Sequence, residues 1–312
     1  MDKYFLMSLI PGRMADANKG TYGKVLIIAG SEGMSGAAYL SGLACYRSGA
    51  GLIKLLTHDK NRIILQSSLP EAIVETYEET TAIGACVKKN LAWADFVIAG
   101  PGLSQSELAG RLVFCLLQGL LTQPEKKKVS GLLLDADALN LLAENPELME
   151  LADRTAEKIP VIVTPHPLEM SRLCGVPVSR ILSAPIKTAR TFAETHHMIT
   201  VLKGMHTCII SADARLEYVN RETSPALAKA GSGDVLSGTI GGVFELLHAE
   251  KKYTSEEAAF YATAAAVIVH AEAGRMAAET FGIHGVLAGD TANQIGKVLD
   301  FYIYGTNKGK SL

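Results

Sequence analysis

The sequence predicts an α/β fold with a mostly parallel central sheet. Short apolar runs such as Val25 to Ala29 recur along the first half of the chain, and segments with helical periodicity separate them. Apolar runs of this length are typical of strands that are buried on both faces, as in parallel sheets. No linker, composition change or internal repeat divides the 312 residues. We therefore expect a single domain over residues 1–312.

The expected elements follow in chain order. Val25–Ala29 is the first strand, and a helix of small residues follows from Ala37 to Ser48. Further strands are expected at Ile53–Thr57, Phe96–Ala99, Leu132–Leu134 and Val161–Val163, and helices near Ala82–Ala92, Glu107–Leu117 and Ala138–Ala143. Three closely spaced strands predict a hairpin-rich edge at Ile199–Leu202, Thr207–Ser211 and Arg215–Val219. The remainder is expected to be helical, at Asp234–His248, Ser255–Ala273 and Ala288–Ile303.

Composition and charge exclude several classes of protein. The 30 basic and 32 acidic residues give a formal net charge of −2, so we expect no nucleic-acid partner. The longest nearly apolar stretch, Ala258 to Val269, is shorter than the ~20 residues that span a bilayer, so we expect no membrane partner. The first residues lack the pattern of a signal peptide, and the five cysteines form no close pairs. We therefore expect a cytoplasmic protein with reduced thiols.

The most informative motif is Gly231-Ser232-Gly233-Asp234, which precedes a predicted helix. Glycines let the backbone approach a ligand closely, and the free N–H groups at a helix start favour an anion such as phosphate. A carboxylate there would repel phosphate unless it had a chemical task, so Asp234 is a candidate base. We expect the helix N-terminus to keep Asp234 ionised. The alternative is that Ser232 or Asp234 only caps the helix, and the local sequence does not decide between the two.

Other polar motifs also follow predicted strands, where ligands bind in parallel sheets. His166 lies between two prolines, and Glu169 comes three residues later. A metal pair would need a third ligand, which the neighbouring sequence lacks, so a rigid imidazole that contacts a ligand is favoured. Asp135 and Asp137 follow another strand. One of them could hold a cation or nucleotide, and the other could cap the next helix.

Two glycine motifs do not fit the nucleotide loops that they imitate. Residues 30–36 have the spacing G-x-x-G-x-x-G instead of G-x-G-x-x-G, which argues against a dinucleotide site of the Rossmann type. Residues 305–311 resemble a Walker A loop but have one residue too few between the glycines and no helix after them. We interpret this last segment as a solvated tail.

Taken in order, the motifs resemble the ribokinase-like superfamily and, more closely, the ADP/ATP-dependent NAD(P)H-hydrate dehydratases. The resemblance covers about nine-tenths of the chain and rests on KGTYGKV, GAAYLSGLACYRSGAGL, GPGLS, LDADALN, VTPHPLEM, VLKG and GSGDVLSG, ending near Ala288-Gly289-Asp290. The GSGD motif is shared with ribokinases, whereas TPHP-x-EM together with DADALN is more specific to the dehydratases. The resemblance implies a three-layer α/β/α fold of the ribokinase-like type.

The resemblance also implies a reaction and a set of site residues. Hydrated NADH or NADPH would be phosphorylated on the ring hydroxyl by ADP or ATP with Mg²⁺, and phosphate would then leave to restore the dinucleotide. Asp234 would be the catalytic base and a substrate contact. The hydrated dinucleotide would also contact Ala38, Gly102 and His166. The nucleotide would bind Lys203, Gly204, Met205, His206, Thr207, Gly231, Ser232 and Gly233. The metal ligands stay unassigned.

Three residues depart from the family's usual pattern: Lys229, Ser224 and Gly289. The resemblance further implies a homo-oligomer, such as a tetramer, and cooperation with a separate epimerase of the hydrated dinucleotide. The alternative enzyme is a small-molecule kinase acting on a hydroxyethylthiazole or a sugar, which would share GSGD but would not need TPHP-x-EM. A non-catalytic nucleotide-binding regulator is a third interpretation, which loss of the aspartate would favour, but Asp234 is present.

Overall fold

The computed structural model describes residues 1–124, 129–222 and 224–305. Nine strands form one sheet in the order β3-β2-β1-β4-β5-β6-β7-β8-β9. Their bounds are β1 (Lys24–Ile28), β2 (Leu52–His58), β3 (Ile73–Tyr77), β4 (Phe96–Ala99), β5 (Gly131–Leu134), β6 (Val161–Val163), β7 (Ile199–Leu202), β8 (Thr207–Ile210) and β9 (Glu217–Asn220). The pairings from β3 across to β7 are parallel, and β8 and β9 extend the sheet as antiparallel strands. The predicted parallel sheet with a hairpin-rich edge is confirmed.

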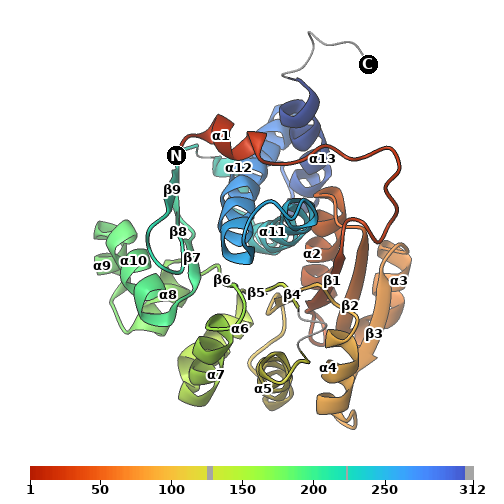
Figure 1. Cartoon of the computed structure of the whole chain (residues 1–312). Helices are drawn as coiled ribbons and strands as arrows, with labels where there is room; N and C mark the ends of the chain where they lie inside the picture. Colours follow the sequence, from red (N-terminus) through yellow and green to blue (C-terminus); the bar gives the residue numbers. More distant parts are fainter. Residues whose placement is uncertain (125–128, 223, 306–312) are drawn as a thin grey trace.

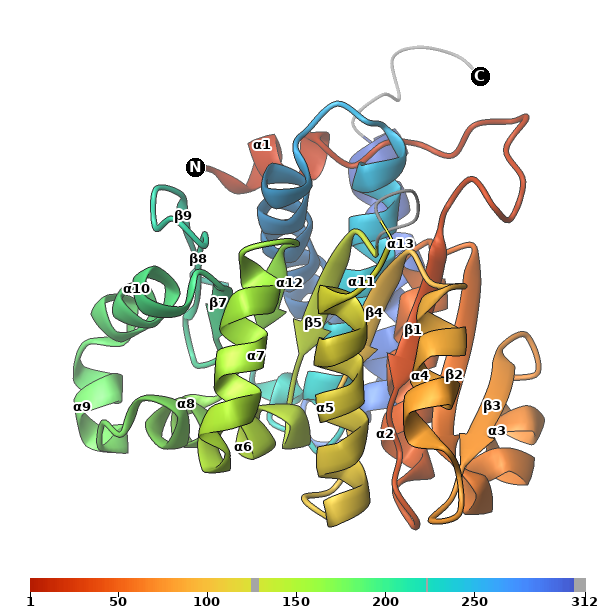
Figure 2. The ribbon, with the colours of Figure 1, turned by 60° about the horizontal axis from the view of Figure 1, so that its bottom comes forward.

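Helices cover both faces of the sheet and make three layers (Figure 1). One face carries α1 (Lys3–Ser8), α2 (Ser35–Arg47), α3 (Arg62–Ser68), α11 (Ser232–Ala249), α12 (Ser255–Phe281) and α13 (Ala288–Tyr304). The other face carries α4 (Ile83–Leu91), α5 (Glu107–Leu121), α6 (Asp137–Glu144), α7 (Pro146–Ala156), α8 (Pro167–Cys174), α9 (Val178–Ser183) and α10 (Pro185–His196). Figure 2 shows α4, α5 and α7 in front of the strands, with α11, α12 and α13 behind them. Two short 3₁₀ helices complete the set, Asp59–Asn61 and Pro225–Leu227.

A large apolar cluster lies on each face of the sheet. In β1, Val25 and Ile27 belong to one cluster, whereas Leu26 and Ile28 belong to the other. Because neighbouring residues of a strand point to opposite faces, burial on both sides requires an unbroken apolar run. This explains the VLII sequence that predicted the strand.

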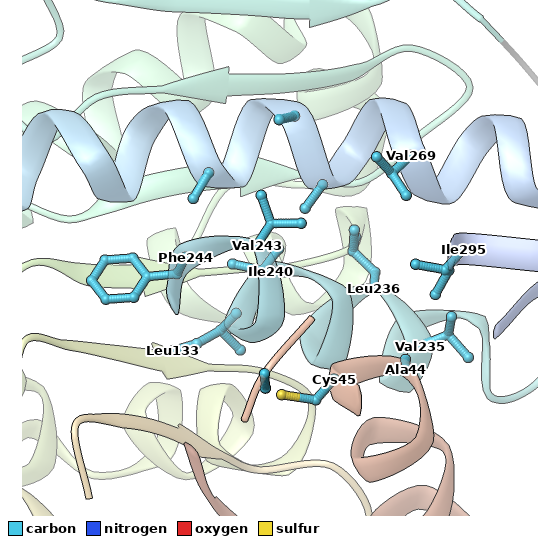
Figure 3. Close-up of a cluster of buried hydrophobic side chains, with 14 of the residues drawn as sticks. Ala44, Cys45, Leu133, Val235, Leu236, Ile240, Val243, Phe244, Val269 and Ile295 are labelled. Atoms are coloured by element: carbon cyan, nitrogen blue, oxygen red, sulfur yellow. The ribbon is translucent and has the colours of Figure 1, made fainter. Parts of the chain in front are cut away.

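Helix α11 lies at the centre of one apolar layer, between the sheet and α12 (Figure 3). Its Ile240 and Phe244 are fully buried, and the ring centroid of Phe244 lies 4.5 Å from that of Phe96 in β4. Gly238 permits the close approach of α2, because a Cβ atom at this position would lie 2.1 Å from the carbonyl oxygen of Ser41. Gly238 therefore allows α11 to pack directly against the backbone of α2.

The structure adds elements that the sequence pattern did not predict. These are the edge strand β3 and the helices α1, α3, α7, α8, α9 and α10. Helix α12 also continues to Phe281, beyond the predicted end at Ala273. In the described ranges no helix is long and apolar enough to cross a membrane. Apart from Gly305, the Walker-like segment 305–311 lies outside the described residues, so the interpretation as a solvated tail stays a prediction.

Candidate active site

A cavity of about 820 Å³ opens beside the carboxyl ends of β5, β6 and β7. Four of the predicted motifs contribute to its wall: DADALN after β5, TPHP after β6, the Lys203 loop after β7, and GSGD at the start of α11. The wall includes Asp135, His166, Glu169, Lys203, Ser232, Gly233, Asp234 and His270. The sheet topology thus brings together residues that are far apart in the sequence, as expected for the ends of parallel strands.

Lys203 is a cation of the cavity wall that lies beside two carboxylates. Its Nζ atom lies 2.9 Å from Oδ1 of Asp135 and 3.9 Å from Oε2 of Glu169. Burial alone would lower the pKa of Lys203, but the two carboxylates raise it above its usual value. Burial alone would likewise raise the pKa of Asp135, but Lys203 and a 2.7 Å hydrogen bond from Ser237 Oγ lower it. Lys203 and Asp135 therefore form an ionised pair.

Asp234 lies in the first turn of α11, with its side chain partly buried in the cavity wall. Burial raises the pKa of Asp234 to about 7, the charges of Asp135 and Asp137 add to the rise, and Lys203 opposes it. The expectation that the helix N-terminus keeps Asp234 ionised was therefore wrong, because desolvation and like charges outweigh the helix dipole. At neutral pH the carboxyl group is divided between its two protonation states.

The capping interpretation of the GSGD motif is also wrong. The N-cap residue of α11 is Gly231, and no side-chain hydrogen bond caps the helix. Gly231 has a φ of +86°, and a Cβ atom there would lie 2.5 Å from Leu40. Gly233 has no positive φ, and a Cβ atom on it would lie 3.4 Å from Lys203 Nζ. Gly231 thus provides the positive φ that the turn before α11 requires, whereas Gly233 keeps the backbone free of a side chain beside Lys203.

His166 is fixed as the N-cap of α8. Its Nδ1 atom accepts hydrogen bonds from the backbone N–H groups of Leu168 and Glu169, both at 3.2 Å. Glu169 returns the contact, because its Oε2 atom accepts from the His166 backbone N–H at 2.8 Å. Burial, and then the charge of Lys203, lower the pKa of His166, which favours the neutral ring. This is a capping box and not a metal pair.

Neither aspartate of DADALN caps α6 with its side chain, contrary to the prediction for one of them. The N-cap is Ala136, with a φ of +50°, and no side-chain hydrogen bond is made there. Asp137 instead accepts a 2.8 Å hydrogen bond from the Ser104 backbone N–H, in the loop after β4. In the described residues, no group of three or more His, Cys, Asp or Glu side chains could hold a metal ion.

Some predicted site residues lie outside the cavity wall. Ala38 in α2 and Gly102 in the loop after β4 are buried, and the Gly102 loop packs against the segment before α2, with Ser31 N–H donating to Gly102 O at 2.6 Å. His206 is exposed in the β7–β8 turn, whereas Gly204, Met205 and Thr207 line the cavity. The binding roles of all these residues stay predictions.

The three departures from the family pattern have different surroundings. Ser224 and Lys229 line the cavity, and Lys229 Nζ donates to His284 O at 2.9 Å. Gly289 lies in the first turn of α13, where a Cβ atom would meet nothing within 4 Å. A serine side chain would thus fit at position 289 without displacing a neighbour.

Sequence reasoning missed three residues of this site. Glu169 was noted only as a partner of His166, yet it also faces Lys203. Ser237 is fully buried and ties α11 to Asp135. His270 lies in α12 with its Nε2 atom 3.3 Å from Ser232 Oγ. A histidine within the alanine-rich run of α12 was the available signal, because such a residue needs a polar partner when buried.

Comparison with known proteins now assigns the family. A family model described as NAD(P)H-hydrate dehydratase matches residues 25–297. The chain belongs to the NAD(P)H-hydrate dehydratase family. Its relatives include the ADP-dependent (S)-NAD(P)H-hydrate dehydratase of Neisseria meningitidis, which is 33% identical over 285 residues, covering 90% of this chain and 86% of that protein.

Several relatives of this dehydratase-family chain are longer. The bifunctional NAD(P)H-hydrate repair enzyme of Coxiella burnetii is 35% identical over 282 residues, which is 90% of this chain but 51% of that enzyme. The corresponding enzyme of Escherichia coli is 31% identical over 301 residues, 96% of this chain and 52% of its own length. The chain thus spans about half the length of these bifunctional relatives.

Solved structures confirm the ribokinase-like three-layer fold. The ADP/ATP-dependent NAD(P)H-hydrate dehydratase of Bacillus subtilis, co-crystallised with ATP/Mg²⁺, superposes with a TM-score of 0.76 at 29% identity, covering 96% of this chain and 97% of that one. A ribokinase-like superfamily protein of Enterococcus faecalis gives 0.75 at 26% identity, with coverage of 97% and 95%. The dehydratase family and its fold are therefore established over nearly the whole chain.

Proposed function

We propose that this protein uses ADP or ATP to dehydrate hydrated NADH or NADPH, which returns the dinucleotide to its functional form. The observation that carries the proposal is Asp234, a carboxyl group with a pKa of about 7 in the wall of the cavity, beside the start of α11. Family membership and the printed activities of the Neisseria and Bacillus relatives support it. They do not favour the alternative of a hydroxyethylthiazole or sugar kinase.

In the first step, the ring hydroxyl of the hydrated dinucleotide attacks the terminal phosphorus of the nucleotide. The new oxygen–phosphorus bond forms as the bond to the leaving nucleotide breaks, and Asp234 accepts the hydroxyl proton. A pKa near the working pH suits a group that must take and later release a proton. The N–H groups at the start of α11 and the Lys203 ammonium stabilise the negative charge of the transferred group.

In the second step, the carbon–oxygen bond to the phosphorylated hydroxyl breaks and phosphate leaves. The neighbouring ring carbon loses one proton to solvent, and the double bond of the nicotinamide re-forms. Overall, one nucleotide phosphate bond is hydrolysed for each dinucleotide restored. The nucleotide is needed because phosphate is a far better leaving group than hydroxide.

We further propose that Mg²⁺ enters as the complex with the nucleotide phosphates. The carboxylates of Asp135 and Asp137 already accept hydrogen bonds, and the described side chains offer no ready-made metal centre. Mg²⁺ is commonly bound through substrate phosphates with few protein ligands. Co-crystallisation of the Bacillus relative with ATP/Mg²⁺ supports this mode of entry.

We also propose a cytoplasmic homo-oligomer that works with a separate epimerase of the hydrated dinucleotide. All five cysteines are free thiols, as a reducing compartment allows. Aromatic side chains are exposed on two adjacent helices, Tyr4 of α1 and Phe301 and Tyr304 of α13, which supports a self-association surface. The relatives named as bifunctional repair enzymes support a second activity that acts on the same substrate. Light scattering on the purified protein measures its oligomeric state.

The proposed reaction is tested with hydrated NADH, Mg²⁺ and either ADP or ATP, following the return of the dihydronicotinamide absorbance. The wild-type protein should restore the absorbance only when nucleotide is present. Asp234→Asn preserves the shape of the side chain but removes the base, which typically costs about 10²–10⁴ in rate. That variant should still bind nucleotide by calorimetry. No recovery by the wild-type protein with either nucleotide would contradict the proposal.

A further inference from the structure

His270 reaches from α12 to the first turn of α11, and no assigned role accounts for it. The side chain is 7% exposed and lines the cavity. Its Nε2 atom lies 3.3 Å from Oγ of Ser232, across a sequence separation of 38 residues. Helices α11 and α12 pack side by side (Figure 1). The contact therefore joins a buried ring to the turn where the phosphate groups are proposed to bind.

The ring is held in its neutral form. Burial lowers the pKa of His270 to about 4, a hydrogen bond to the Ser232 backbone opposes this shift, and the positive charge of Lys203 adds to it. A neutral imidazole carries one N–H donor and one acceptor nitrogen. The Ser232 hydroxyl can donate one hydrogen bond and can also accept one. The tautomer of His270 therefore decides whether Ser232 can donate its proton to a ligand.

A phosphate group selects one of these arrangements, because its oxygens can only accept hydrogen bonds from Ser232. When Nε2 carries the proton and donates to Ser232 Oγ, the hydroxyl proton of Ser232 is directed away from His270 and toward the cavity. With the opposite tautomer, Ser232 donates to the ring and has no proton for the ligand. Phosphate binding thus favours the Nε2–H tautomer.

The first turn of α11 has little else to orient this hydroxyl. Its N-cap, Gly231, has no side chain, and no side-chain hydrogen bond caps the helix. Among the described residues, the His270 contact is the one side-chain hydrogen bond made by Ser232 Oγ. Asp234 follows two positions later, so the same turn carries both the hydroxyl donor and the base.

We propose that His270 is a positioning residue of the nucleotide site, which holds the Ser232 hydroxyl so that its proton faces the phosphate groups. The inference rests on the proposed function in placing nucleotide phosphates at the start of α11. His270 itself neither transfers a proton nor contacts the reacting atoms. Its effect passes through Ser232 alone, which gives the proposal a specific signature in double variants.

The test compares His270→Leu, Ser232→Ala, the double variant and His270→Gln in nucleotide binding and turnover. A hydrogen bond to a charged group contributes enough that each single loss should weaken ADP and ATP about 10–100-fold. The double variant should be no weaker than Ser232→Ala, because both changes remove one interaction. His270→Gln retains an N–H donor and should recover most of the loss. The KM for the hydrated dinucleotide should stay unchanged throughout.

A matched control replaces another histidine of this protein whose pKa is lowered by burial. His248 lies on α11, stacks on Phe244 and is absent from the cavity wall, and burial lowers its pKa as well. His248→Leu should therefore leave nucleotide affinity at the wild-type value. Additive losses in the double variant, or His270→Gln as weak as His270→Leu at equal melting temperature, would overturn the inference.

Calorimetric titration with Mg-ADP separates this inference from the proposed reaction. That measurement needs no hydrated dinucleotide, so the coupling between His270 and Ser232 is read from dissociation constants alone. Normal coupling without any return of absorbance would overturn the reaction and leave the inference in place. Turnover with additive binding losses would do the reverse.

Discussion

The ammonium of Lys203 lies 2.9 Å from the carboxylate of Asp135, and this pair joins the ends of β7 and β5 inside the cavity. The second oxygen of Asp135 accepts from Ser237, one turn beyond Asp234 on α11. The sheet and the helix that carries the base are therefore linked through one carboxylate. The contacts among Lys203, Asp135 and Ser237 therefore both neutralise the buried charge of Asp135 and fix the position of Asp234.

Removing Lys203 should reduce both stability and turnover. Lys203→Met leaves the Asp135 carboxylate buried without its partner, a loss that typically costs about 3–5 kcal/mol. Lys203→Met combined with Asp135→Asn removes both charges and should restore most of the stability in urea unfolding. Turnover should stay about 10²–10³-fold low in both variants, because the transferred phosphoryl group lacks the ammonium.

As a control, Lys89→Met breaks a 2.7 Å pair with Glu75 outside the cavity and should leave turnover unchanged. Wild-type turnover in the double variant would show that Lys203 is only structural.

Turnover should depend on the ionisation of Asp234. The base works in its ionised form, so kcat/KM should rise with pH and level off above a pKa of about 7. Asp135 disfavours the ionised form by repulsion, so Asp135→Asn should move this rise to lower pH. Asp153→Asn, whose side chain contacts His196 outside the cavity, should leave the profile in place. A pH profile of kcat/KM for the wild-type protein, Asp135→Asn and Asp153→Asn measures the direction of the shift. An unchanged profile in Asp135→Asn would argue that another group titrates.

Variants of His166 should separate its capping role from ligand contact. His166→Ala removes the side-chain acceptor of the first turn of α8, which typically costs about 1 kcal/mol of stability. His166→Asn preserves a capping oxygen and loses the imidazole. Both variants should raise the KM for the hydrated dinucleotide far more than the dissociation constant of ADP, and only the alanine variant should lower the melting temperature. Equal losses for the two ligands would refute the assignment of His166 to the dinucleotide.

Glu245 should make the protein less stable as the pH rises. This residue of α11 is 3% exposed, and its Oε1 atom has no hydrogen-bond partner among the described residues. Burial raises the pKa of Glu245 to about 8, and the charge of Asp95 contributes. Between its usual pKa of 4.5 and this value, the folded protein holds a proton that the unfolded chain has released. Stability therefore falls as pH rises through this window.

Replacing Glu245 by glutamine should remove that dependence. The free energy of unfolding of Glu245→Gln should exceed that of the wild-type protein by an amount that grows from pH 5 to pH 8, about 1.4 kcal/mol for each unit at most. Urea unfolding at several pH values measures the difference. A constant difference between the two proteins would mean that Glu245 does not titrate in this range.

The sequence predicted the strands that are buried on both faces, because their apolar runs are continuous. Phe96–Ala99, Val161–Val163 and Ile199–Leu202 have the predicted bounds. Strand β3 escaped prediction because it lies at the edge of the sheet and carries polar residues such as Glu75, which removes the apolar run. Helices α8 and α10 are about as amphipathic as the predicted helix α5, so their periodic patterns were present in the sequence but were overlooked.

The site was predicted where residues follow strands and missed where they depend on helix packing. Asp135 and Lys203 come directly after strands, and His166 lies three residues beyond the end of β6, so the topology of the sheet places them together. His270 and Ser237 enter the site through the packing of α11 on its neighbours. The sequence shows His270 as a polar residue within an alanine-rich helix but does not show which residue it contacts. The pKa of Asp234 was mispredicted for the same reason, since burial and the nearby carboxylates depend on the assembled cavity.

The contact between Gly238 of α11 and Ser41 of α2 has a consequence for protein synthesis. These segments lie about 200 residues apart in the sequence. The surface of α2 that contacts α11 can therefore be covered only after most of the chain has been translated. At ribosomal rates of about 5–20 residues per second, the nascent chain presents this apolar surface to solvent for roughly 10 seconds or longer. Ribosome-bound intermediates halted before α11 should therefore be the species that chaperones capture, and the catalytic cavity is assembled only after their release.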